Sequence, residues 1–244
     1  MPKPRSQQIS LLDTPYYHIC SRTVRKAFLC GVDKATGISF EHRRSWIEKR
    51  LFQLAQVFAI DICAHAIMHN HLHLVLHVDS KQIKQWTTED ILQRWHQLFK
   101  GTLLTQQYLN KAPLADYQLA MVEATAKVYQ QRLIDISWFM RCLNEPIARQ
   151  ANQEDKCTGH FWEGRFKSQA LLDEGALLSC MAYVDLNPVR AAIAPTPEES
   201  SFTSIQLRIK AAINGEQSKQ LLSFTGNEHQ HKTHGIVAPK LLTY

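Results

Sequence analysis

The stretch Met68-His69-Asn70-His71-Leu72-His73-Leu74-Val75-Leu76-His77-Val78 alternates between two kinds of side chain. From residue 72 the leucines fall on one side, whereas His71, His73 and His77 fall on the other. A period of two predicts a β-strand with one apolar face and one face that carries imidazoles. His71 and His73 project side by side there, and neutral imidazole is a common metal ligand. The stretch predicts a divalent-metal site, with a solvent-facing imidazole pair as the alternative.

The sequence around this strand predicts a chain of further elements. They are strand 16–23, helix 42–58, strand 58–68, the strand after 70, a helical segment 80–133, a helix from about 135, strand 165–172 and helix 173–187. Thr88 and Asp173 are predicted N-caps, and Pro188 is expected to stop the last helix at Asn187. Without 80–133, this order is an α+β, ferredoxin-like βαββαβ unit with an antiparallel sheet and a C-terminal helix. Strands one and three are expected at its centre.

The domain organisation follows from this order. We expect one domain over 1–198 with a helical insertion at about 80–133, and a polar C-terminal tail over 199–244 with one helix at 202–213. A hydrophobic content of 45% is ordinary for a folded protein. The net charge of +6 is compatible with a nucleic-acid partner and equally with a slightly basic enzyme.

Several classes of protein are excluded by what the sequence lacks. The six cysteines form no C-x-x-C pair, which argues against zinc-ribbon and thioredoxin-like sites. The start has no apolar signal region and no apolar run is long enough to cross a membrane, so we expect a cytoplasmic protein without a membrane partner. The chain also lacks the glycine-rich phosphate-binding motifs and the serine nucleophile elbow.

The helix predicted at 173–187 carries a second candidate feature. Tyr183 and Asn187 lie four residues apart and share one face, next to an apolar stripe of Leu177, Met181 and Val184. The Tyr183 hydroxyl is therefore free to point at the metal, and the amide oxygen of Asn187 could complete its coordination. The alternatives are an ordinary packing tyrosine and a helix-ending asparagine before proline.

Three motifs together resemble a known family. They are Met68-x-Asn70-His71-x-His73-x-Val75, Phe161-Trp162-Glu163-Gly164-Arg165-Phe166 and Tyr183-Val184-Asp185-Leu186-Asn187-Pro188-Val189-Arg190. This combination is similar to the single-tyrosine transposases of the HUH endonuclease superfamily, and most similar to the REP-associated tyrosine transposases. The resemblance covers roughly 15–80 and 135–195, whereas 80–133 and the tail have no counterpart in the simplest members.

The resemblance implies a role for each matching residue. His71 and His73 would bind Mg²⁺ or Mn²⁺, with Asn187 as third ligand, and Tyr183 would be the nucleophile. It implies cleavage and rejoining of single-stranded or hairpin DNA, as in transposition, through a 5′-phosphotyrosine that leaves a free 3′-hydroxyl. A metal stabilises the charge that develops on the phosphate, an effect of several kcal/mol. The alternative is a domesticated protein that binds hairpin DNA without cutting it, and both monomer and homodimer stay open.

Basic and aromatic residues near these motifs are candidates for DNA contacts. Arg22, Arg165, Lys167 and Arg190 would contact phosphates, because cations dominate the affinity for the DNA backbone. Trp162 could stack on an unpaired base. The alternatives are solvated surface charges and a tryptophan packed in the core. A barrel-type H-x-H metallohydrolase is disfavoured, since the chain has no repeated strand-helix units.

Overall fold

The computed structural model describes residues 8–24, 28–33, 35–225 and 236–237. Its first elements are β1 (Tyr16–Arg22), α1 (His42–Val57), β2 (Ile60–Ile67), β3 (His71–Val78), the 3-10 helix η2 (Gln82–Gln85), α2 (Thr88–His96) and α3 (Leu103–Leu109). They are followed by α4 (Asp116–Leu133), α5 (Ile136–Glu154), β4 (Lys167–Ala170), α6 (Glu174–Arg190), α7 (Ser204–Ile213), β5 (Phe224–Thr225) and β6 (Ile236–Val237).

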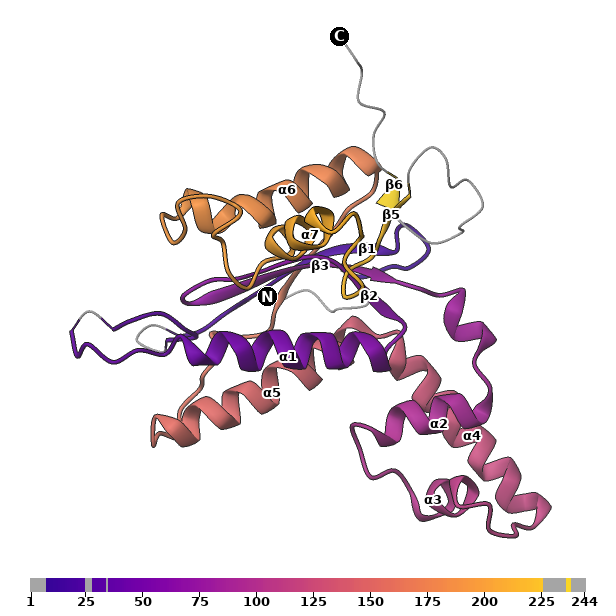
Figure 1. Ribbon diagram of the computed structural model, residues 1–244. Helices are drawn as coiled ribbons and strands as arrows, with labels where there is room; N and C mark the ends of the chain where they lie inside the picture. Colours follow the sequence, from indigo (N-terminus) through magenta and orange to yellow (C-terminus); the bar gives the residue numbers. More distant parts are fainter. Residues whose placement is uncertain (1–7, 25–27, 34, 226–235, 238–244) are drawn as a thin grey trace.

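Four strands form one antiparallel sheet in the order β2-β3-β1-β4, with β1 and β3 at its centre as predicted. The register sets Tyr16 opposite His77 and Arg22 opposite His71. Helices α1 and α5 cover one face of the sheet, while α6 and α7 lie over the other (Figure 1). The predicted α+β class with a ferredoxin-like βαββαβ order and an additional helix is confirmed.

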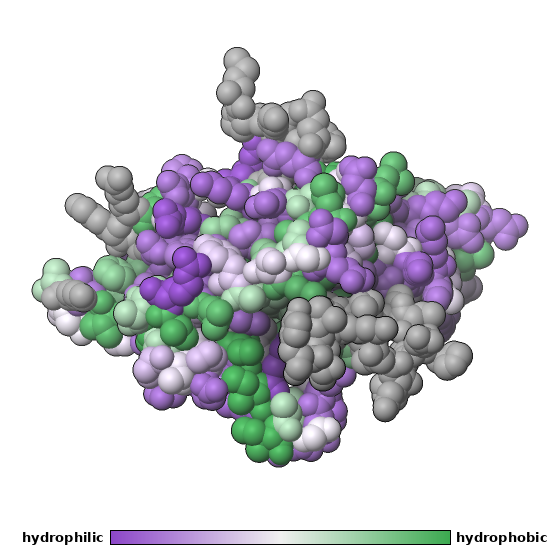
Figure 2. Space-filling view, turned by 90° about the horizontal axis from the view of Figure 1, so that it is seen from above, coloured by the Kyte–Doolittle hydropathy of each residue, from purple (hydrophilic) through white to green (hydrophobic). Residues whose placement is uncertain are grey.

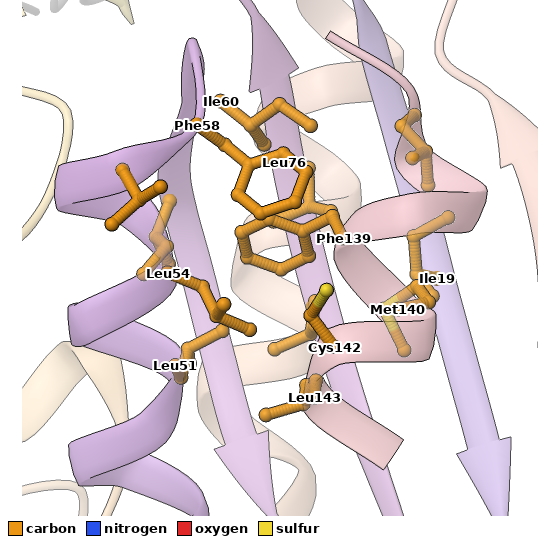
Figure 3. Packing of buried hydrophobic residues seen from close by; sticks show 14 of the residues in the cluster. Ile19, Leu51, Leu54, Phe58, Ile60, Leu76, Phe139, Met140, Cys142 and Leu143 are labelled. Atoms are coloured by element: carbon orange, nitrogen blue, oxygen red, sulfur yellow. The ribbon is translucent and has the colours of Figure 1, made fainter. Parts of the chain in front are cut away.

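The alternation in β3 divides its side chains between two apolar clusters. Leu72, Leu74 and Leu76 are fully buried in the larger one, the main core, beneath α1 and α5. In Figure 3, Phe58 and Phe139 meet there edge to face, with ring centroids 5.3 Å apart. Each such side chain contributes roughly 1.5–3 kcal/mol when it is fully buried. The main core therefore supplies most of the apolar burial that holds the sheet rigid.

The opposite face of the sheet packs against α6 through a smaller cluster, the second core. Val75 of β3 meets Leu177, Met181 and Val184 of α6 in this cluster. Helix α6 begins where the Asp173 side chain accepts a hydrogen bond from the Ala176 N–H at 2.7 Å, as its predicted N-cap role requires. The apolar stripe predicted on this helix is thus the surface that docks α6 on β2 and β3.

Helix α6 extends further than predicted, through Pro188 to Arg190. A proline removes one backbone donor, but here the loss falls in the last turn. The Asn187 carbonyl still accepts from the Ala191 N–H at 2.9 Å, so the turn closes around the proline. The predicted stop at Asn187 is wrong for this reason. Helix α5 likewise runs through Pro146.

The segment predicted as a helical insertion contains η2, α2, α3 and α4, which extend away from the sheet (Figure 1). Trp95 stacks against both Tyr129 and Phe99, with ring centroids 4.4 and 4.5 Å away. Helix α2 is capped by Thr87, which exchanges hydrogen bonds with Asp90, and not by Thr88 as predicted. Thr88 is already helical, because the reciprocal capping bonds start one residue earlier.

The two ends of this insertion meet at one residue, Ala59, which directly precedes β2. The N–H of Ala59 donates to the Leu133 carbonyl at 3.0 Å, and the Ala59 carbonyl accepts from the Asp79 N–H at 2.9 Å. The chain therefore leaves the sheet after β3 and returns before α5 at nearly the same point.

The C-terminal segment is held on the sheet by α7. Thr203 pairs with Ala66 in an isolated β-bridge, and the buried Ser204 hydroxyl donates to the Asp185 carboxylate of α6. The Ile205 N–H donates to the same carboxylate at 3.0 Å. The helix predicted at 202–213 is confirmed. Parts of the predicted polar tail, 226–235 and 238–244, lie outside the described residues, and the domain boundary at 198 stays a prediction.

No helix in the described ranges combines the length and the apolar content that a membrane crossing needs.

Candidate active site

Strands β1 and β3 bring three histidines together beneath α6. Because the leucines of β3 face the main core, His71 and His73 face the side of α6. In β1 the same alternation sends Tyr17 and Ile19 into the main core and His18 to the side of α6. His18 was not among the predicted site residues. The alternation of strand 16–23 nevertheless indicates that its side chain lies on the face opposite Tyr17 and Ile19.

Tyr183 of α6 lies over these imidazoles. Its ring centroid is 5.6 Å from that of His73 and 6.2 Å from that of His18, both in edge-to-face contact. The rings of His71 and His73 are 4.8 Å apart. Because Leu177, Met181 and Val184 form the neighbouring face of the helix that docks on the sheet, Tyr183 lies at its edge and keeps 42% of its surface exposed. The structure thus brings Tyr183, His71 and His73 together.

A cavity of about 380 Å³ opens at this point of the sheet. Its lining consists of Cys20, Arg22, His71, His73, Glu163, Gly164, Arg165, Lys167 and Tyr183. Three of the predicted DNA contacts, Arg22, Arg165 and Lys167, are exposed here beside the imidazoles and the phenol. This combination of cations, imidazoles and a phenol suits an anionic, phosphate-containing ligand. Glu163 and Cys20 also line the cavity and were not predicted.

The histidines of the site are held neutral. Burial is the main cause that lowers the pKa of His73, to about 3, and the neighbouring His71, His18 and Arg22 lower it further. Burial also lowers the pKa of His71, with Arg22 as a second cause, and burial alone lowers the pKa of His18. Neutral imidazoles are the form that binds a metal.

Both candidate metal ligands are hydrogen-bonded through the same ring atom. His71 Nδ1 lies 2.7 Å from Asn70 Oδ1, and His73 Nδ1 lies 3.0 Å from His18 Nε2. The two Nε2 atoms have no such bond among the described residues. No three His, Cys, Asp or Glu side chains of the described chain form a preassembled metal cluster. Two imidazoles with available nitrogens nevertheless fit a cation that takes its other ligands from water and substrate.

The remaining predicted residues lie around the cavity. Arg190 approaches the Tyr183 ring, with its guanidinium carbon 5.6 Å from the ring centroid. Asn187 is half-buried one turn after Tyr183 and is not among the described residues that line the cavity, so its ligand role stays a prediction. Trp162 packs against the main core and donates its indole N–H to the Asn144 carbonyl at 2.8 Å. That position agrees with the alternative of core packing.

A second cavity of about 620 Å³ adjoins the first and shares Arg22, His71 and Glu163 with it. Apolar side chains, including Phe28, Met68 and Ile193, form part of its wall. Figure 2 views the molecule from the side of α6 and α7, where the surface is predominantly hydrophilic with hydrophobic residues scattered through it. The two cavities together provide more room than a single phosphate requires.

Comparisons with known proteins give one structural likeness. No protein-family model and no curated protein matches this sequence. A chain in the solved structure of a REP-associated tyrosine transposase bound to a REP hairpin is similar to this chain, with a TM-score of 0.49 and 12% sequence identity. The alignment covers 87% of this chain and 87% of that chain.

Proposed function

We propose that this protein cleaves and rejoins DNA strands, with Tyr183 as the nucleophile and a divalent metal at His71 and His73. The observation that carries the proposal is the contact of the Tyr183 ring with the His73 ring, 5.6 Å between centroids, in a cavity rimmed by cations. These residues come from β3 and α6, more than a hundred positions apart in the sequence, and they converge on one opening.

The reaction would be a transesterification at phosphorus. The Tyr183 hydroxyl oxygen attacks the phosphorus, the bond to the 3′-oxygen breaks, and the phenol proton leaves as the 3′-oxygen gains one. The products are a 5′-phosphotyrosine and a free 3′-hydroxyl, which can attack in the reverse direction and rejoin the strand. Because the covalent bond retains the energy of the phosphodiester, rejoining needs no further cofactor.

The chain's own cations would bind and orient the substrate. Arg22, Arg165 and Lys167 stand at the rim, where they neutralise the backbone charge and hold the phosphate against Tyr183. Arg190 lies beside the Tyr183 ring, where it would contact a neighbouring phosphate. The glutamate of the lining, Glu163, is a candidate to receive the phenol proton.

Mg²⁺ or Mn²⁺ would be held by the Nε2 atoms of His71 and His73, with Asn187 as the third ligand that the resemblance implies. A bound divalent metal supplies charge neutralisation at the phosphate and helps to generate the phenolate. The substrate class, single-stranded or hairpin DNA, is inferred from the three sequence motifs. The exposed cavity supports it, because an unpaired strand can reach the site without a groove that fits a duplex.

The covalent intermediate gives the test. The protein is incubated with end-labelled single-stranded hairpin DNA and Mn²⁺, and a denaturing gel is examined for a protein–DNA adduct. The wild type should form the adduct and Tyr183→Phe should abolish it while hairpin binding persists. Tyr117→Phe, an exposed tyrosine of α4, is the matched control and should leave the adduct unchanged.

Two results would overturn the proposal. An adduct that persists in Tyr183→Phe would assign the nucleophile to another residue. Tight hairpin binding by the wild type without any adduct, across several hairpins with Mn²⁺ and with Mg²⁺, would favour the alternative of a hairpin-binding protein that does not cut.

A further inference from the structure

The two candidate metal ligands, His71 and His73, are hydrogen-bonded to other side chains in the same way. Each uses Nδ1 for a hydrogen bond inside the protein, His71 to Asn70 and His73 to His18. The acceptor atom of Asn70 is its side-chain oxygen, which can only accept. His71 must therefore carry its proton on Nδ1, which leaves the lone pair on Nε2.

The contact between His73 and His18 is an edge-to-edge hydrogen bond. The ring planes are inclined by only 16° and the centroids lie 5.1 Å apart, while the two nitrogens are 3.0 Å apart. Only one of these nitrogens carries the proton. If His18 donated, His73 would hold its remaining proton on Nε2 and could not use that atom as a ligand. If His73 donates, its Nε2 presents a lone pair as His71 does.

Both partners are fixed by the backbone. His18 lies in the middle of β1, where it pairs with Val75 of β3 and Gln169 of β4. The Asn70 carbonyl accepts from the Thr23 N–H at 2.9 Å and from the Thr23 hydroxyl at 3.1 Å, which ties the turn before β3 to the end of β1. The backbone positions of both acceptor residues are thus fixed independently of any bound ligand.

We propose that His18 and Asn70 are positioning residues that hold His73 and His71 as Nδ1–H tautomers, so that both Nε2 atoms keep the lone pair that a metal ligand needs. The inference rests on the proposed function for the identity of the ligand. The nitrogen that carries the proton in each ring is a property of the metal-free protein, and it can be measured in the absence of metal. His18 then carries its own proton on Nδ1, because its Nε2 accepts from His73.

The first test is the tautomer. Full-length protein labelled with ¹⁵N-histidine and freed of metal is studied by long-range ¹H–¹⁵N correlation, which distinguishes protonated from unprotonated ring nitrogens. The rings of His71 and His73 should each carry the proton on Nδ1. A proton on Nε2 of His73 in the wild type would overturn the proposal.

The second test is the affinity for Mn²⁺ alone, measured by electron paramagnetic resonance. His18→Phe keeps a ring but removes the acceptor, and it should weaken binding by about 10- to 100-fold. His18→Gln returns an acceptor near the position of Nε2 and should recover most of the loss. Unchanged binding in His18→Phe, or equal losses in the two variants, would overturn the proposal.

The control is His77→Phe, the same substitution on the same face of β3, at a histidine whose Nδ1 bonds Asp61 and which is not part of the cavity lining in the described chain. It should bind Mn²⁺ as the wild type does. Neither test uses DNA or Tyr183, so the result stands apart from the proposed function. A protein with the expected tautomers and Mn²⁺ affinity that forms no DNA adduct would refute strand cleavage and leave this inference intact.

Discussion

The two faces of strand β3 differ in what they contact, although alternate residues of one eight-residue strand form both. The leucine face is fully buried under α1 and α5, where its contacts are apolar. The histidine face meets α6 at the small second core and then opens into a cavity with cations and a phenol. The comparison teaches that stability and chemistry are assigned to opposite sides of the same backbone. A substitution at an even-numbered leucine of β3 should therefore lower stability, whereas one at His71 or His73 should lower activity.

His73→Ala should give the largest effect, on the reaction and not on folding. Loss of one proposed metal ligand should remove several kcal/mol of transition-state stabilisation, which corresponds to on the order of 10³-fold in the cleavage rate. Single-turnover cleavage of a hairpin, compared with urea unfolding of the same variant, checks this. A variant that cleaves within tenfold of the wild type would show that the histidine face does not carry the reaction.

Leu74→Ala, at the next residue, should have the opposite profile. Its side chain is fully buried in the main core, so the truncation should lower the free energy of unfolding by about 2–5 kcal/mol. The cleavage rate of the folded fraction should stay near that of the wild type. Urea unfolding monitored by tryptophan fluorescence gives the first quantity. A smaller loss of stability than in His73→Ala would contradict the division between the two faces.

Lys167→Ala should give the smallest effect, at the rim of the histidine face. Removal of one phosphate contact should weaken hairpin binding by a few-fold and reduce the slope of log affinity against log salt by about 1. Lys127→Ala, an exposed lysine of α4 in the insertion, is the matched control and should leave both quantities unchanged. Equal effects of the two substitutions would mean that Lys167 contributes only general charge.

The sequence was sufficient for the features that depend on local periodicity. Alternation in 71–78 predicted the strand and its two faces, and the spacing of Leu177, Met181 and Val184 predicted the docking side of α6. Asp173 was correctly predicted as a cap, since its hydrogen bond reaches only three residues along the chain. These features were predictable because each depends only on residues that are close together in the sequence.

The features that the sequence did not reveal depend on register and tertiary packing. The alternation in β1 indicates the face on which His18 lies, but its contact with His73 also depends on the register between β1 and β3, which no local pattern specifies. Trp162 is held against the core by its hydrogen bond to the Asn144 carbonyl of α5, which is eighteen residues away in the sequence. The end of α6 was misplaced because hydrogen bonds around Pro188 offset the local preference against helix.

The convergence of Asp79 and Leu133 on Ala59 has a consequence for how this chain can change over evolution. Since the whole excursion from 80 to 133 departs from and returns to a single backbone position, its length is uncoupled from the spacing between β3 and α5. Segment 80–133 can become longer or shorter, or be replaced by another module, without a change in the positions of His71, His73 and Tyr183. Related chains with the same sheet are therefore expected to differ most at this junction.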